Sequence, residues 1–306
     1  MSNISIIIFS GGKCGSSTLH QTFLNSGYES VHIHNVQDFN NISNTFNSKD
    51  FNDFINNSTN RIFIIDSYRD PVERMISSFF QNIDNFLGPN YQEVDLNLIN
   101  YHLSKNYMIE DYHPLDDTFP FFKEIPFNDK YIIVTIKNIT YIKLRFSDIN
   151  NWSDYLSEIF NREIVISDDN LTINKEYYNI YNKFKSEYKI SKEFYNKIIE
   201  DPMFKKYNSD DEQMIYLKKW KSKIRDDEYF KSKIQNVVFN TLPNDFNWQT
   251  YIEYNEDLQE YNSEIYAKYH YVFFGFRELR IYKHKNLPID FSPDIYRYLN
   301  KIGRAH

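Results

Sequence analysis

The chain has 306 residues and a mass of 37.1 kDa, enough for one large domain or for a large domain with a small one. Its hydrophobic content of 41% and its 26 Tyr and 26 Phe exclude an intrinsically disordered chain. The net charge of −7 argues against a nucleic-acid-binding protein that depends on a large basic surface. A single cysteine, Cys14, excludes an intrachain disulfide framework.

Apolar segments long enough to cross a bilayer are absent from the sequence. The longest apolar runs, residues 6–9 and 131–134, fall far below the ~20 residues that a membrane helix needs. The first ten residues lack the basic region and long apolar stretch of a secretory signal. We therefore expect no membrane span and a cytoplasmic location.

Strand, turn and helix follow one another from the N-terminus. Residues 4–9 predict a buried strand, residues 10–15 a glycine-bearing turn, and residues 16–26 a helix that ends before Gly27. Residues 30–34 alternate in polarity as a strand does. Residues 61–66 form the next buried strand in this prediction.

A further helix is predicted to begin at Pro71, because proline is favoured at the first helical position. Asp70 and Glu73 form a capping-box signature around it. Residues 131–136 and 141–146 predict two more strands, followed by a mostly helical region to about residue 227. This order indicates an α/β fold with a mainly parallel central sheet flanked by helices.

The C-terminal part of the sequence differs in pattern from the rest and contains an internal repeat. Residues 242–255 repeat at an offset of 45, with six of 14 positions identical. We interpret residues 242–286 as one small helical repeat unit and 287–306 as the start of a second. The predicted domains are therefore an α/β domain at 1–240 and a small helical module at 241–306.

The glycine-bearing turn at residues 10–15 predicts an anion-binding site. Backbone N–H groups at a helix N-terminus point at an anion, and Lys13 adds a positive charge. Hydroxyl groups follow at the helix start: Ser16, Ser17 and Thr18. The spacing fails the nucleoside triphosphatase P-loop pattern, because Cys14 stands where Ser or Thr would bind Mg²⁺. It also fails the dinucleotide-binding pattern, because residues 7–10 contain no glycine.

A second anion site is predicted at the start of the next helix. Arg69 precedes Pro71, and Ser77 lies two turns into the helix. A planar guanidinium and a hydroxyl at this spacing can converge on one phosphate.

Together the two segments resemble the phosphate-binding motifs of sulfotransferases. Residues 12–19 resemble their 5′-phosphosulfate loop, and residues 68–77 resemble their 3′-phosphate motif. Residues 141–149 resemble a later strand and turn that precede a tryptophan-containing helix. The resemblance covers roughly residues 1–225, is closest to carbohydrate sulfotransferases, and implies a P-loop-like sulfotransferase fold. The C-terminal unit resembles a short repeat module that some glycan-modifying enzymes carry.

The resemblance implies the donor 3′-phosphoadenosine 5′-phosphosulfate and the product adenosine 3′,5′-bisphosphate. The reaction would be an in-line transfer of a sulfuryl group to a hydroxyl of a carbohydrate acceptor. No metal would be required. Lys13 would stabilise the leaving phosphosulfate. The residues that the resemblance assigns to donor binding are Gly12, Lys13, Cys14, Gly15, Ser16, Ser17, Thr18, Arg69 and Ser77.

A general base must take the proton of the acceptor hydroxyl, and histidine suits this role near neutral pH. His32 and His34 are two residues apart on a predicted strand, so their side chains share one face. The polysaccharide branch carries a similar histidine pair between its two phosphate motifs. We favour His34, which is nearer the carboxyl end of the strand, with His32 as the second candidate.

Two other functions stay open from the sequence alone. A nucleotide or small-molecule kinase would need a hydroxyl side chain directly after Lys13. A catalytically inactive protein of the same fold would bind nucleotide or glycan without turnover. The expected absence of a membrane anchor fits a bacterial or large-virus enzyme better than an ordinary Golgi-resident one.

Overall fold

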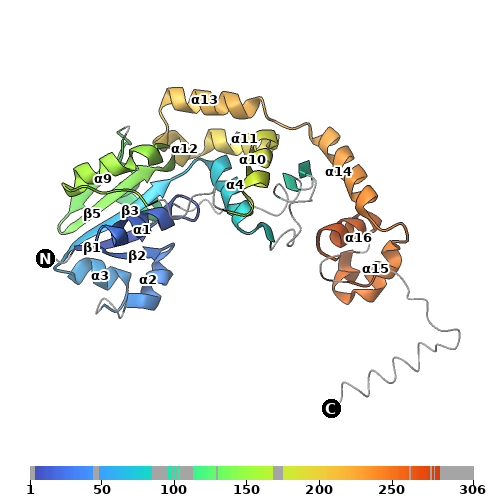
Figure 1. Ribbon diagram of the computed structural model, residues 1–306, viewed down its shortest axis with the longest axis horizontal. Coiled ribbons are helices and arrows are strands. Elements are labelled where there is room, and N and C mark those ends of the chain that lie inside the picture. The colour runs from blue at the N-terminus through green and yellow to red at the C-terminus, as the bar shows by residue number, and fades with distance from the viewer. Residues whose placement is uncertain are drawn as a thin grey trace, which may run out of the picture. The chain divides into compact units, whose positions relative to one another are not determined.

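A five-stranded sheet forms the centre of the first part of the chain (Figure 1). The computed structural model describes residues 4–43, 48–84, 96–97, 99–100, 103, 113–128, 130–167, 175–261, 263–275, 278 and 280–282. The strands are β1 Ile4–Phe9, β2 Glu29–Ile33, β3 Arg61–Tyr68, β4 Ile132–Ile136 and β5 Ile139–Arg145. Their order is β2-β1-β3-β5-β4, and all neighbours are parallel except β4 and β5. The prediction of an α/β fold with a mainly parallel sheet is therefore confirmed.

Helices cover both faces of this sheet, because alternate residues of each strand point to opposite sides. On one face Ile6 and Ile8 of β1 pack with Leu19 of α1 and Trp152 of α9. On the other face Ile7 and Phe9 lie in the cluster that includes α2, α3, α7, α8 and α12 side chains. The helices of these two layers are α1 Ser16–Asn25, α2 Val36–Ile42, α3 Phe51–Asn57, α7 Pro114–Thr118, α8 Pro120–Lys123, α9 Trp152–Phe160 and α12 Pro202–Tyr207.

Helix α4, Pro71–Gln81, continues from the carboxyl end of β3 and packs against the later helices. The Phe80 ring lies 5.3 Å from both the Tyr181 and Phe184 rings of α10, Tyr178–Glu187. The remaining helices of this unit are α11 Lys192–Glu200 and α13 Asp210–Lys221, with a 3₁₀ turn at Phe146–Asn151. One face of α4 is apolar and buried, with Met75, Ile76, Phe79 and Phe80.

The predicted capping box at the start of α4 is wrong. Pro71 does occupy the first helical position, but the Asp70 side chain makes no capping hydrogen bond. Instead Asp70 Oδ1 accepts from Asn208 Nδ2 at 3.2 Å, and Glu73 accepts from the Tyr216 hydroxyl at 2.6 Å. Both carboxylates have been drawn into tertiary contacts with the later helices.

The chain divides into two compact units, Met1–Asn82 with Ile99–Asp227, and Ile83–Leu98 with Glu228–His306. The second unit includes α14 Asp227–Thr241, α15 Trp248–Tyr254 and α16 Glu264–His270, with a 3₁₀ turn at Glu256–Tyr261 and a π turn at Tyr271–Gly275. Its small core is built from Tyr251, Ile252, Leu258, Ala267 and Tyr271. The partial second repeat predicted at 287–306 lies outside the described residues.

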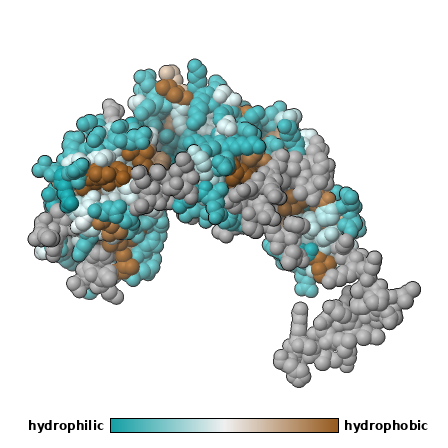
Figure 2. Space-filling view, in the orientation of Figure 1, coloured by the Kyte–Doolittle hydropathy of each residue, from teal (hydrophilic) through white to brown (hydrophobic). Residues whose placement is uncertain are grey.

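The visible face of the sheet-containing unit is mostly hydrophilic (Figure 2). A small apolar patch lies where Figure 1 places α13, which carries the exposed side chains of Met214 and Ile215. Within the ranges given above, no helix is both long and apolar enough to span a membrane.

Candidate functional site

The turn between β1 and α1 is the predicted anion-binding loop, and two of its residues have left-handed backbone conformations. Lys13 and Gly15 both have left-handed conformations, with φ of 70° and 89°. Gly15 is the N-cap of α1, and a Cβ at this position would meet Trp152 Cη2 at 2.8 Å, so glycine is required. Alternation of right- and left-handed residues turns successive N–H groups toward one point, where an anion can bind.

Donors from β3, from α4 and from the turn between them hold three successive carbonyl groups of this loop. Arg74 Nε donates to the Gly12 carbonyl at 3.2 Å, and Arg69 Nη1 donates to the Lys13 carbonyl at 2.8 Å. Ser67 Oγ donates to the Cys14 carbonyl at 2.5 Å. Since the N–H of a peptide unit points away from its C=O, these three bonds direct the N–H groups of residues 13–15 to the opposite side. Sequence reasoning missed this role for Ser67 and Arg74.

Two cationic side chains stand together at the loop. The pKa of Lys13 is lowered to about 8, because its amine is partly buried and because Arg69 and Lys175 lie near. The Arg69 guanidinium lies 4.3 Å from the centre of the Phe146 ring. Its Nε is buried and has no hydrogen-bond partner among the described residues. A bound anion would offset the repulsion between Lys13 and Arg69 and could accept a hydrogen bond from Arg69 Nε.

The other predicted loop residues differ in accessibility. Ser17 and Gly12 are exposed and Thr18 is half-buried, whereas Ser16 and Cys14 are buried. Burial raises the pKa of the Cys14 thiol, and the thiol contacts the Gly12 carbonyl at 3.7 Å. Cys14 is therefore a packed loop residue whose thiol is not accessible to a ligand.

Histidine side chains lie at the carboxyl ends of β1 and β2. The predicted strand at 30–34 is β2, Glu29–Ile33, so His34 lies just past its end. His34 Nδ1 lies 2.8 Å from the Ser10 carbonyl oxygen, and the His32 and His34 ring centres are 4.5 Å apart. Because a carbonyl oxygen only accepts, Nδ1 of His34 carries a proton in this hydrogen bond. His34 is exposed and linked to the first residue of the anion-binding loop.

The His32 side chain is less exposed to solvent than that of His34. Burial, with the nearby His34 and His20, lowers the pKa of His32 to about 4, against the opposing effect of Asp38. His32 is therefore neutral at pH 7. Its Nε2 is buried without a hydrogen-bond partner in the described part of the chain.

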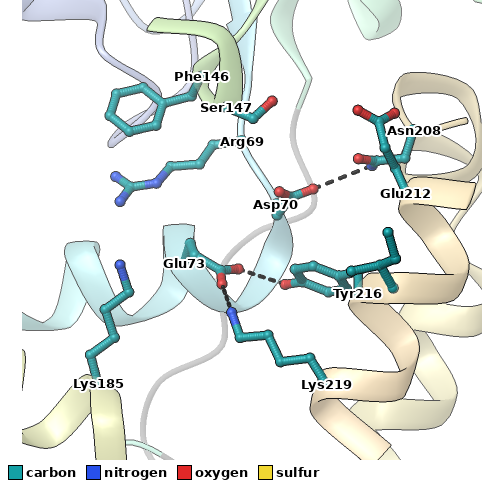
Figure 3. A pocket seen from close by; sticks show the side chains of 11 residues that line it. Arg69, Asp70, Glu73, Phe146, Ser147, Lys185, Asn208, Glu212, Tyr216 and Lys219 are labelled. Atoms are coloured by element: carbon teal, nitrogen blue, oxygen red, sulfur yellow. Dashed lines mark hydrogen bonds and ion pairs between the residues drawn. The ribbon is translucent and has the colours of Figure 1, made fainter. Parts of the chain in front are cut away.

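A pocket of about 490 Å³ opens beside Arg69, at the start of α4 (Figure 3). Ser77 lies half-buried further along the same helix. The pocket is lined by Arg69, Asp70, Glu73, Phe146, Ser147, Lys185, Asn208, Glu212, Ile215, Tyr216 and Lys219. Arg69 of the second predicted anion site therefore borders a cavity large enough for part of a nucleotide, whereas Ser77 is not among the residues that line it.

No family model, curated protein or solved structure matches this chain. Across the described ranges, no group of three or more His, Cys, Asp or Glu side chains is arranged to hold a metal ion.

A buried ion cluster beneath the site was not foreseen from the sequence. Lys143 Nζ of β5 donates to Asp66 Oδ2 at 2.6 Å and to Asp116 Oδ2 at 3.0 Å, and all three side chains are fully buried. Lys206 and the Tyr207 hydroxyl also donate to Asp116, at 2.7 Å and 2.8 Å. The sequence does place one charged residue in each of two apolar strands, Asp66 in β3 and Lys143 in β5, and this could have indicated a buried ion pair. The two residues are register partners in the sheet.

Proposed function

We propose that this chain is a sulfotransferase that binds 3′-phosphoadenosine 5′-phosphosulfate and transfers its sulfuryl group to a hydroxyl of a carbohydrate. One observation carries the proposal. The anion-binding loop has its carbonyls held by Arg69 and Arg74, so that Lys13 and the loop N–H groups lie together, and His34 is bonded to the same turn. The two segments so joined are those that resemble the phosphate motifs of sulfotransferases.

The residues present fit an anionic donor. The N–H groups at the start of α1 have no partner within the helix and carry its positive dipole end. Lys13 would contact the phosphosulfate end, while Arg69 has an unpaired buried donor to offer the 3′-phosphate. The donor, when bound, supplies an activated sulfuryl group attached to a good leaving group.

His34 is the base in this proposal. Its Nδ1 proton is engaged by the Ser10 carbonyl, which fixes the tautomer and directs the lone pair of Nε2 away from the loop backbone. Nε2 would take the proton of the acceptor hydroxyl as the oxygen attacks. His32, neutral and packed against His34, would keep that ring in place.

The kinase alternative is weakened by the packing of Cys14. A kinase of the P-loop type would need a hydroxyl at this position aimed at Mg²⁺. Here the side chain is a thiol, 2% exposed, and lies against the carbonyl of its own loop. No observation favours the kinase over the sulfotransferase.

A thermal-shift titration tests the proposal, with adenosine 3′,5′-bisphosphate, ADP and ATP with Mg²⁺ as separate ligands. At a hundred times its dissociation constant, a ligand stabilises the native state by about 2.7 kcal/mol. We expect this shift with the bisphosphate alone, and its loss in Lys13→Met. Lys130→Met, which removes an exposed lysine from the surface, is the matched control. Stabilisation by ATP with Mg²⁺ alone would replace the proposal with a kinase, and no stabilisation by any ligand would reject both.

A further inference from the structure

Lys185 lies outside both phosphate motifs, yet it lines the pocket beside Arg69. It belongs to α10, and its amine points toward the Arg69 guanidinium, on the side of the pocket away from Tyr216 and Glu212 (Figure 3). Its amine interacts electrostatically with both Glu73 and Arg69. A lysine from a separate helix has thus been brought to the side of α4 where Glu73 and Ser77, one helical turn apart, are neighbours.

The carboxylates around this pocket are already paired. Glu73 accepts from the Tyr216 hydroxyl at 2.6 Å and from Lys219 Nζ at 2.9 Å. Asp70 accepts from Asn208, and Glu212 accepts from Arg145 at 2.8 Å. Lys219 and Arg145 thus offset the charges of Glu73 and Glu212, whereas Asp70 is hydrogen-bonded to a neutral amide.

Arg69 and Lys185 differ from Lys219, which forms an ion pair with Glu73. Among the residues that the structure describes, neither of the two is within ion-pair distance of a carboxylate. Burial lowers the pKa of Lys185, whose Nζ lies 5.8 Å from the centre of the Tyr181 ring, one turn earlier in α10. Glu73, the pocket carboxylate that interacts with Lys185, is already engaged by Lys219, so Arg69 and Lys185 together form a site for a doubly charged anion.

We infer that Lys185 is a third ligand of the 3′-phosphate, with Arg69 and Ser77, and that it makes the site selective for nucleotides phosphorylated at the 3′ position. The inference rests on the proposed function and adds to it a residue that neither motif contains. Arg69 supplies directed hydrogen bonds, whereas Lys185 supplies a mobile point charge that can follow the phosphate as it enters.

Calorimetric titration of two nucleotides into three proteins tests the inference. The nucleotides are adenosine 3′,5′-bisphosphate and adenosine 5′-monophosphate, which differ in the 3′-phosphate. The proteins are the wild type, Lys185→Met and the control Lys183→Met, an exposed lysine of the same helix. Methionine keeps the apolar stem, and an unchanged Tm will show that each variant is folded.

We expect Lys185→Met to weaken bisphosphate binding about ten- to a hundredfold and monophosphate binding by less than about twofold. Lys183→Met should change neither, and Lys185→Arg should keep most of the bisphosphate affinity. Equal losses for both nucleotides, or no loss with Lys185→Met, would overturn the inference while leaving the proposed function intact. A wild-type chain that binds neither nucleotide would overturn both.

Discussion

Replacement of Lys143 by methionine tests whether the buried ion cluster holds β5 against β3. The Lys143 amine is the bridge between Asp66 and Asp116, with no exposure of any of the three side chains. Methionine is similar in length and has an apolar stem, so the change removes a charge with little change in packing. Two buried carboxylates then face each other, with Lys206 left beside Asp116 only.

The expected loss is large. Removal of one member of a buried ion pair costs about 3–5 kcal/mol, because the remaining charge is uncompensated. For a unit of this size each kcal/mol lowers Tm by about 2–4 °C, so Tm should fall by roughly 6–20 °C at neutral pH. The control is Lys130→Met, since the Lys130–Glu158 pair is separated by 3.6 Å and both side chains are more than half exposed. That pair contributes at most about 1 kcal/mol.

Urea unfolding between about pH 5 and pH 8 is the decisive assay. In the wild type, burial alone would raise the pKa of Asp116, but Lys143 and Lys206 outweigh it and lower that pKa. The resulting stability is present above the unfolded pKa, near 3.9, and should be constant over this range.

The Lys143→Met protein should behave differently, because its carboxyl pair takes up a proton on acidification. Its native state then binds more protons than the unfolded state, and the deficit should shrink as the pH falls from about 7 to 5. A loss below about 1 kcal/mol, or a deficit that is equal at both ends of the range, would refute the reasoning.

Three other substitutions test the loop, the pocket and the base. Gly15→Ala should lower the free energy of unfolding in urea more than Gly27→Ala does. Both glycines are left-handed, with φ of 89° and 79°, but of the two only Gly15 has a neighbour, Trp152, that a Cβ would meet. Equal losses would contradict this. Burial raises the pKa of Asp70 to about 6, so its carboxyl stabilises the fold in acid and this contribution is lost as the pH rises through 6. Asp70→Asn should therefore raise Tm near pH 7 and have little effect near pH 4, and a uniform shift would argue against it. His34→Gln should abolish sulfuryl transfer in a radiolabel assay and leave bisphosphate affinity within about twofold, whereas retained turnover would assign the base elsewhere.

Much of the fold could be predicted from the sequence, because strand and helix periodicities are local properties. The apolar runs at residues 4–9 and 61–66 are strands, and α1 begins at Ser16 as expected. Pro71 begins α4. A two-residue loop at 137–138 joins β4 and β5 in a hairpin, so β4 lies antiparallel at the sheet edge. Such an edge strand is compatible with a mainly parallel sheet.

The contacts that organise the site could not be predicted, because they depend on strand order and register. Ser67 and Cys14 are 53 residues apart, and they meet only because β3 lies beside β1. Lys143 and Asp66 are paired because β5 is the other neighbour of β3. The capping-box prediction failed for the same reason, since local preference gave way to tertiary partners more than 130 residues away, Asn208 after α12 and Tyr216 in α13.

Hydrogen bonds connect the predicted anion-binding loop to the centre of the sheet. Asp66 Oδ1 accepts from the Ser67 N–H at 2.6 Å, and Ser67 Oγ in turn holds the Cys14 carbonyl. A continuous chain of polar contacts thus joins the buried amine of Lys143 to the peptide groups of the loop. A loop without these contacts would lose backbone entropy on binding an anion, whereas one with its carbonyls already engaged presents preorganised N–H groups. Apolar residues could pack the sheet equally well, so the buried charges have their clearest physical rationale in holding the loop.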